Sequence, residues 1–111
     1  MAAGTYNFIL EQGATFSRRL TVEENNSALN LTGYTGRAQM RSTHDSSSIA
    51  LSFTVAVSDA TNGILSMSAS ATSTAGLTPG QYVYDVEIES SAGTVTRLLE
   101  GTVTVNPEVT K

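Results

Sequence analysis

The amino-acid sequence predicts an all-β fold, an antiparallel β-sandwich of about seven strands that forms a single domain over residues 1–111. Segments with alternating apolar and polar residues recur along the chain and are separated by short polar turns, as in β-sandwiches. Only 14% of the residues are charged, and Ser and Thr fill many positions between the apolar ones. This composition suits a pleated surface better than a helical bundle. A length of 111 residues is enough for one domain with its own core.

The chain is organised around a long β-hairpin predicted over residues 77–105. Apolar and polar residues alternate from residue 81 to residue 89, which indicates a strand with one buried and one solvated face. The predicted buried face carries Tyr82, Tyr84, Val86 and Ile88, and the solvated face carries Val83, Asp85, Glu87 and Glu89. Residues 90–93 have turn chemistry, because Gly93 tolerates the positive φ that closes such a loop.

The returning strand, residues 94–105, departs from simple alternation. Arg97 falls in an otherwise apolar row, and two leucines stand side by side at Leu98 and Leu99. Either a β-bulge near residues 98–101 shifts the phase, or Arg97 lies at the sheet rim and reaches a carboxylate. We favour the bulge, since Gly101 is easily accommodated there.

Four strands are predicted in the first half of the chain. They span residues 5–10, 15–22, 35–42 and 49–57. Arg18 interrupts the apolar face of the second one. A polar loop over residues 23–27 contains Asn25 and Asn26, which tolerate left-handed backbone conformations. Another loop, over residues 43–48, is rich in small polar residues.

The sequence between residues 59 and 76 predicts a turn, a short strand and one short helix. Asn62 and Gly63 form the strongest hairpin signal in the chain. The strand follows at residues 64–68, and the helix is predicted within residues 70–76, capped by Ser70 or Thr72 and ended by Gly76. The residues expected in or near one core are Phe8, Phe16, Leu20, Met40, Leu51, Phe53, Val55, Tyr84, Val86 and Val103.

Charge and composition exclude several classes of function. The net charge is −4, the pI is about 4.7 and like charges are not clustered, which argues against nucleic-acid binding. The chain has no cysteine, so neither a disulfide nor a thiolate metal site is expected. No apolar run reaches the ~20 residues of a membrane span, and the N-terminal sequence MAAGTYNF does not resemble a signal peptide. We therefore expect a protein made in the cytoplasm with no membrane partner.

No group of residues predicts catalysis, and we expect no catalytic, cofactor-binding or metal site. His44 and Asp45, followed by three serines, are the residue types of a hydrolase triad, but neighbours in one loop do not converge as a triad must. Asp85, Glu87 and Glu89 share a strand face but fan apart by ~7 Å per step, too far to enclose one calcium ion. A solvated face paired with Arg97 or Arg37 is the simpler interpretation. Glycines 76, 80 and 93 match no phosphate-binding motif.

Four segments in order resemble a family of small bacteriophage virion proteins. They are YNFILEQGATF (residues 6–16), LTGYT (31–35), AGLTPGQYVYD (75–85) and GTVTRLLEG (93–101). The layout is similar to the N-terminal domain of the phage baseplate upstream protein family. The resemblance covers nearly the whole chain and implies an immunoglobulin-like sandwich that docks receptor-binding parts onto the tail.

The resemblance implies a non-enzymatic structural protein of a phage virion, made in the host cytoplasm. Two roles stay open: a tail or baseplate module that joins neighbouring virion proteins, or a decoration protein that stabilises the head. The expected partners are other virion proteins, in a homo-oligomer or symmetric array, without nucleic acid or membrane. We expect the chain ends, residues 1–4 and 106–111, to make these contacts together with the edge strands, by strand addition.

Overall fold

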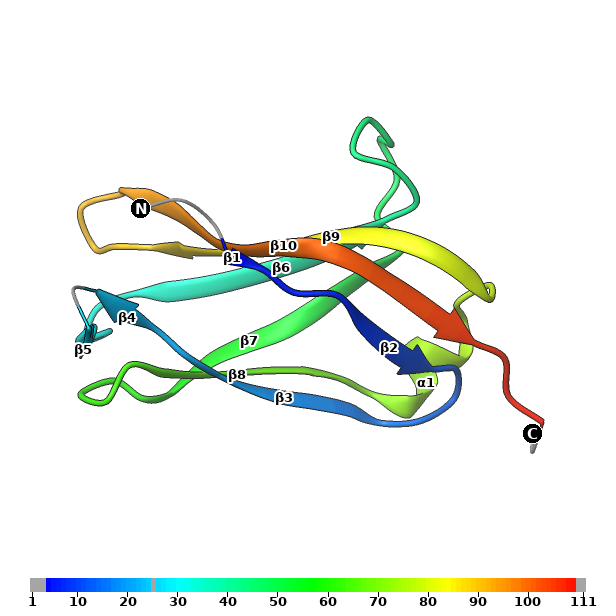
Figure 1. Cartoon of the computed structure of the whole chain (residues 1–111), viewed down its shortest axis with the longest axis horizontal. Coiled ribbons are helices and arrows are strands. Elements are labelled where there is room, and N and C mark those ends of the chain that lie inside the picture. The colour runs from blue at the N-terminus through cyan, green and yellow to red at the C-terminus, as the bar shows by residue number, and fades with distance from the viewer. Residues whose placement is uncertain (1–3, 25, 110–111) are drawn as a thin grey trace.

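Two facing layers of β-strands make up the body of the protein (Figure 1). The structure is a computed structural model and describes residues 4–24 and 26–109. Its elements are β1 (Gly4–Thr5), β2 (Phe8–Glu11), β3 (Phe16–Thr21), β4 (Glu23–Glu24), β5 (Ser27–Ala28), β6 (Thr35–Arg41), β7 (Leu51–Asp59), β8 (Ile64–Ala69), α1 (Ala71–Ala75), β9 (Gly80–Glu89) and β10 (Val95–Asn106). Seven of the described strands are longer than two residues, in agreement with the predicted number.

The main sheet has the strand order β1-β10-β9-β6-β7-β8-β3, and β2 also pairs with β10. Strand β7 passes from one layer to the other. Its first residues, Leu51 and Phe53, lie opposite β6, whereas the residues from Thr54 onward pair with β8. The sheet therefore curls over on itself, with β6, β9 and β10 facing β3 and β8 (Figure 1). This arrangement confirms the all-β, immunoglobulin-like sandwich.

The long hairpin is present as predicted. β9 pairs with β10 along nearly their whole lengths, and Gly93 in the connecting turn has a φ of +90°. The register shifts between Arg97 and Leu99, which confirms the bulge. Arg97 also reaches a carboxylate, that of Asp85, as the alternative expected, but it lies on β10 inside the sheet. Gly101 has a different role from the one expected: a side chain there would collide with the main chain of Tyr6.

The N-terminal segment differs from the prediction in pairing and continuity. The expected strand over residues 5–10 is divided into β1 and β2, and both pair with β10 in parallel, not antiparallel. Between them the Tyr6 N–H donates to the Glu100 carbonyl, and the Asn7 Oδ1 accepts from the Thr102 N–H at 2.9 Å. The Asn7 side chain thus replaces a main-chain partner, which interrupts the strand without leaving the ladder unpaired.

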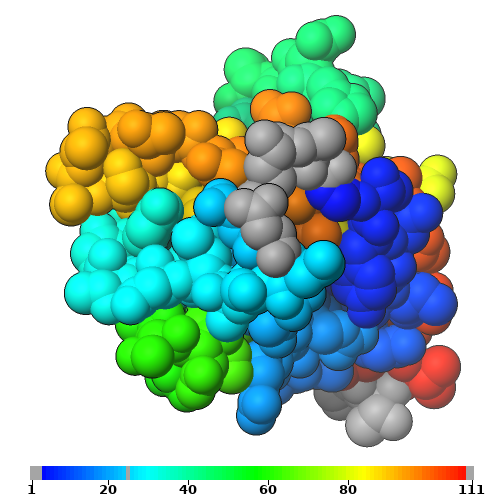
Figure 2. Space-filling view, turned by 60° about the vertical axis from the view of Figure 1, so that its left-hand side comes forward, coloured from blue at the N-terminus to red at the C-terminus, as the bar shows by residue number. Residues whose placement is uncertain are grey.

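Of the two polar loops predicted from the sequence, one contains short strands and the other is a loop throughout. The loop predicted over residues 23–27 contains the two-residue strands β4 and β5, with Asn26 at a φ of +65°; Asn25 lies outside the described residues. The loop over residues 43–48 is a loop as predicted, and it stands out from the body of the molecule (Figures 1 and 2).

Helix α1 is one of the predicted elements that the structure confirms. The Ser70 Oγ accepts from the Ser73 N–H at 3.2 Å, which makes Ser70 the N-cap, and Gly76 ends the helix. Thr74 is fully buried and its hydroxyl donates to the Ala14 carbonyl at 2.8 Å. The helix therefore ties the turn after β2 to the start of β9.

The core between the layers contains every residue that the sequence predicted for it, with Leu20 and Val55 partly buried at its border. Aromatic rings form its centre: Phe8 stacks on Phe16 at 5.1 Å between ring centroids and meets Tyr84 edge-on at 4.9 Å. A second, smaller cluster was not predicted. It consists of Val22, Leu31, Leu65 and Ile88.

Candidate functional site

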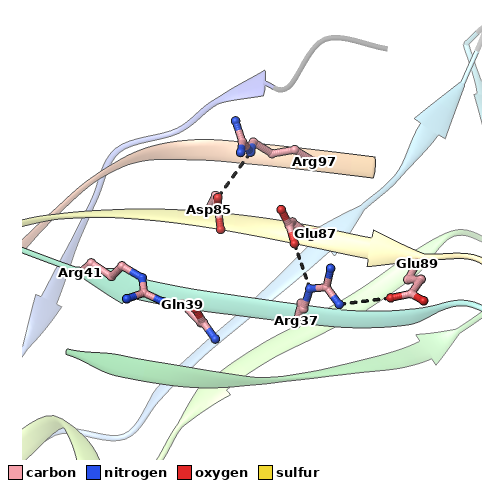
Figure 3. A network of polar contacts seen from close by, with 7 residues as sticks. All are labelled: Arg37, Gln39, Arg41, Asp85, Glu87, Glu89 and Arg97. Carbon is pink, nitrogen blue, oxygen red and sulfur yellow. Dashed lines mark hydrogen bonds and ion pairs between the residues drawn. The ribbon is translucent and has the colours of Figure 1, made fainter. Parts of the chain in front are cut away.

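The exposed face of β6, β9 and β10 carries a cluster of charged side chains (Figure 3). Arg37 bridges two carboxylates of β9, with its Nε 2.9 Å from the Glu87 Oε1 and its Nη1 3.1 Å from the Glu89 Oε1. Arg97 on β10 approaches the Asp85 Oδ2 at 3.4 Å. The acidic row of β9 is thus a solvated face paired with Arg37 and Arg97, as the sequence predicted.

The electrostatics of this face come from partial burial and close neighbours. Partial burial raises the pKa of Asp85, with Glu87 adding to the rise and Arg97 opposing it. The hydrogen bond and charge of Glu87 raise the pKa of Arg37. A shallow hollow of about 350 Å³ lies over Gln39, Arg41 and Asp85. His44, Arg97 and Glu100 also line this hollow. Arg97 pairs with Asp85 there, and Arg41 donates to Gln39 and to the Ser46 carbonyl.

His44 and Asp45 are exposed in the projecting loop. The loop is shaped by its own polar groups: the Ser46 N–H donates to the Thr43 carbonyl, and the Ser46 Oγ bonds the Ser48 main chain. Within residues 4–24 and 26–109, no hydrogen bond joins His44 to Asp45 or to a serine. The structure therefore does not bring the residues of the considered triad together.

Gly76, Gly80 and Gly93 have conformational roles in the main chain. Gly76 is the C-cap of α1, and Gly80 and Gly93 adopt positive φ values of +148° and +90° at either side of β9. Among the residues that the structure describes, no group of three or more His, Asp or Glu side chains is placed to hold a metal ion. None of the helices in this part of the chain is long and apolar enough to cross a membrane.

The curled sheet leaves two strand edges open at the same side of the molecule. Among the residues that the structure describes, β1, at one end of the strand order, pairs only with β10, and β3, at the other end, pairs only with β8. A groove of about 570 Å³ lies between them. Its lining consists of Gly4, Tyr6, Arg18, Arg19, Leu20, Thr21, Val22, Glu23, Leu98 and Leu99.

Figure 2 shows this side of the molecule, with the N-terminal strands in dark blue beside β3 in lighter blue. The groove was not predicted from the sequence. One signal did point to it: Arg18 interrupts an otherwise apolar strand face, and that face lines the groove.

The ends of the chain are held more firmly than the sequence suggested. Gly4 lies opposite Leu99 in the β1–β10 pairing, and Asn106 accepts a hydrogen bond from the Gln12 N–H. The Glu108 N–H donates to the Gln12 Oε1 at 2.9 Å. These contacts tie residues 4 and 106–108 to their own fold, because they belong to or extend the parallel pairing of β1 and β2 with β10. Residues 1–3 and 110–111 lie outside the described residues.

Comparisons with known proteins show the fold and nothing more specific. No family model matches the sequence, and no curated protein matches it. Among the solved structures 113 chains match. One is CopC from Methylosinus trichosporium OB3b, with 13% identity and a TM-score of 0.51, over 100% of this chain and 90% of that chain. At this identity the likeness is one of fold alone, and a fold shared so widely does not select a function.

Proposed function

We propose that this chain is a non-enzymatic structural protein of a bacteriophage virion, a module of the tail or baseplate that joins neighbouring virion proteins. The observation that carries the proposal is the ordered resemblance of four segments, at residues 6–16, 31–35, 75–85 and 93–101, to the N-terminal domain of the baseplate upstream protein family. The proposed partners are other virion proteins, arranged with the chain in a symmetric assembly.

Three of these segments meet in the structure. The Tyr84 hydroxyl donates to the Tyr6 carbonyl at 2.6 Å, joining the first segment to the third. The Gln12 Nε2 donates to the Leu77 carbonyl at 2.8 Å between the same two segments. Gly101 in the fourth segment leaves room for the Tyr6 main chain. These residues therefore dock the N-terminal strand on the long hairpin.

The open edges of β1 and β3 support a joining role. An edge strand presents unpaired main-chain donors and acceptors, so an extended segment of a neighbour can continue the sheet. Both open edges flank one groove. A module of this kind binds its neighbours through main-chain geometry and needs no reactive side chain.

The position of the protein in the particle tests the proposal. Mass spectrometry of purified particles of the phage that encodes the chain should detect it, and antibody labelling with electron microscopy should place it at the tail or baseplate. Labelling over the head surface would replace the tail role by that of a decoration protein. Absence from purified particles would refute both roles.

A second experiment tests whether the projecting loop, residues 43–48, has an enzymatic activity. The double variant His44→Ala, Asp45→Ala should enter particles at the normal level, because substitutions in exposed loops change stability by only about 0.5 kcal/mol. Loss of an enzymatic activity of the particles in this variant would contradict the structural role.

A further inference from the structure

The free edge of β3 exposes a defined set of main-chain groups. The Val22 N–H donates to the Gly63 carbonyl at 2.7 Å and so extends the antiparallel ladder between β3 and β8. Main-chain bonds alternate along such a ladder, so every second residue faces the partner strand and the others face away. Counting back from Val22, the N–H and C=O groups of Ser17, Arg19 and Thr21 point away from β8. These three residues can pair with an incoming strand.

The groove beside this edge is partly apolar. Leu20 and Leu99 contribute half-buried side chains, and Tyr6 is 40% exposed to solvent. β3 has six residues, which at ~3.4 Å per residue gives an edge about 20 Å long. An extended segment of about seven residues therefore spans the edge with alternate side chains in the groove.

Arg18 places a positive charge at this apolar groove. By strand alternation its side chain shares the face of Phe16 and Leu20, and its guanidinium carbon lies 5.2 Å from the centroid of the Phe16 ring. Its Nη1 is 3.4 Å from the carbonyl oxygen of Ser17, one of the edge acceptors, a distance too long for a strong hydrogen bond.

Neither arginine of this edge is neutralised within the described residues. The ion pairs of the described chain involve Arg37 and Arg97, and Arg41 donates to Gln39 and to the Ser46 carbonyl. Arg18 and Arg19 form no ion pair with any described carboxylate. By strand alternation the two side chains lie on opposite faces of β3, and Arg18 is the one on the face of Leu20. Glu23 is the one carboxylate in the described lining of the groove, and it forms an ion pair with neither arginine.

We propose that the β3 edge and its groove accept an extended segment of another protein that carries an acidic side chain facing Arg18. The main-chain groups of Ser17, Arg19 and Thr21 supply the strand pairing, and Arg18 selects the partner. A partner without an acidic group at that position would bury the guanidinium unpaired, which is unfavourable. The inference goes beyond the proposed virion role and does not depend on it.

A second copy of the chain paired through its own β3 does not fit the edge. Antiparallel pairing of two β3 strands about their centres would place Arg18 and Arg19 of one copy beside those of the other. Like charges on directly opposite positions destabilise a pair of strands. The charge of the edge therefore favours an acidic segment from a different protein.

The experiment uses three synthetic peptides and the full-length protein labelled with ¹⁵N. The peptides are acetyl-TVTETVT-amide and the same sequence with Gln or Lys in place of Glu, so that only the side chain aimed at Arg18 changes. Titrations followed by NMR should show the Glu peptide binding about fivefold more tightly than the Gln peptide, and the Lys peptide binding more weakly than both. With the Glu peptide at ten times its Kd, hydrogen exchange at the amides of Ser17, Arg19 and Thr21 should slow about tenfold.

A charge reversal completes the test. Arg18→Glu should reverse the preference, so that the Lys peptide binds more tightly than the Glu peptide. The control variant Arg37→Gln, on the outer face of β6, should keep the original order. If all three peptides bind equally, or if exchange at the three amides does not slow, the proposal is wrong.

One further variant distinguishes two roles for Arg18: selection of an acidic partner, and prevention of association through the exposed β3 edge. If Arg18 served only to prevent association of the edge, Arg18→Val would form dimers or larger species, and the native protein would not distinguish the Glu peptide from the Gln peptide. That combination would also overturn the proposal. Because the test needs no virus particle, it can succeed or fail independently of where the protein is located in the virion.

Discussion

Tyr84 on β9 holds the N-terminal segment with both its aromatic ring and its hydroxyl. The side chain is only 4% exposed, its ring meets Phe8 edge-on, and its hydroxyl donates to the Tyr6 carbonyl at 2.6 Å. The alternation of β9 predicted that Tyr84 would be buried. It did not predict the hydroxyl's partner, because Tyr6 lies 78 residues away in the sequence and a periodic pattern says nothing about which distant strand covers it.

The burial of Tyr84 predicts a dependence of stability on alkaline pH. Burial, with a smaller effect from Tyr6, raises the pKa of the Tyr84 phenol to about 12. The folded state therefore favours the protonated form, whose contribution is complete below about pH 10, the ordinary phenol value. It is lost as the pH rises towards 12. Tyr84→Phe should lower the free energy of unfolding by about 1 kcal/mol at pH 7, and this difference should shrink by pH 11.

Urea denaturation at pH 7 and pH 11 measures both effects. The control is Tyr82→Phe, since the Tyr82 hydroxyl bonds the nearby Thr78 carbonyl in an exposed position and its loss should matter less. A difference between the native protein and Tyr84→Phe that grows from pH 7 to pH 11 would contradict the assignment.

At the scale of elements, local patterns predicted the strands but not all of their pairings. Each long strand has an alternation or a turn signal in its own sequence, and the Asn62-Gly63 turn and the Ser70 cap are local chemistry as well. The parallel placement of β1 and β2 on β10 depends instead on Gln12, Asn7 and Gly101, which act across more than 60 residues of sequence. Tertiary contacts of that kind leave no periodic signal. The groove beside β3 left only the Arg18 interruption in the sequence, which does not say which distant strand lies across the groove.

Gln12 is predicted to hold the N-terminal strand and the end of β10 together. Its amide donates to the Leu77 carbonyl and accepts from the Glu108 N–H, and both bonds are partly buried. Gln12→Ala should therefore lower the free energy of unfolding by about 1–3 kcal/mol, because it leaves two partly buried main-chain groups without partners. Hydrogen exchange at β2 should also accelerate.

The matched control is Gln39→Ala, which removes an amide whose hydrogen bond in the described chain goes to the neighbouring Arg41 side chain, so no main-chain group loses a partner. Its effect should stay within about 0.5 kcal/mol. Chemical denaturation of both variants gives the comparison. Equal losses of unfolding free energy in Gln12→Ala and Gln39→Ala would mean that Gln12 does not stabilise the docking of the N-terminal strand.

For the whole molecule, the decisive feature is that the curled sheet does not close. Closure of a sheet removes its edges, whereas this sandwich leaves β1 and β3 open around one groove. A protein that joins neighbours needs at least two contact sites. The proposed acceptor is the β3 edge, which takes a strand from another protein, and the proposed donors are the ends of the chain.

The last prediction tests the chain ends, the proposed strand donors, separately from the β3 edge, the proposed strand acceptor. Gly4 and residues 106–108 belong to the fold, so the deletion is confined to residues 1–3 and 109–111; Val109 is 96% exposed. The trimmed protein should unfold within about 0.5 kcal/mol of the full chain and should bind the Glu peptide with the same Kd, because the β3 edge is intact. It should nevertheless fail to enter particles when it replaces the full-length protein. Western blots of purified particles measure this, and normal incorporation would move the virion contacts from the chain ends to the loops or sheet faces.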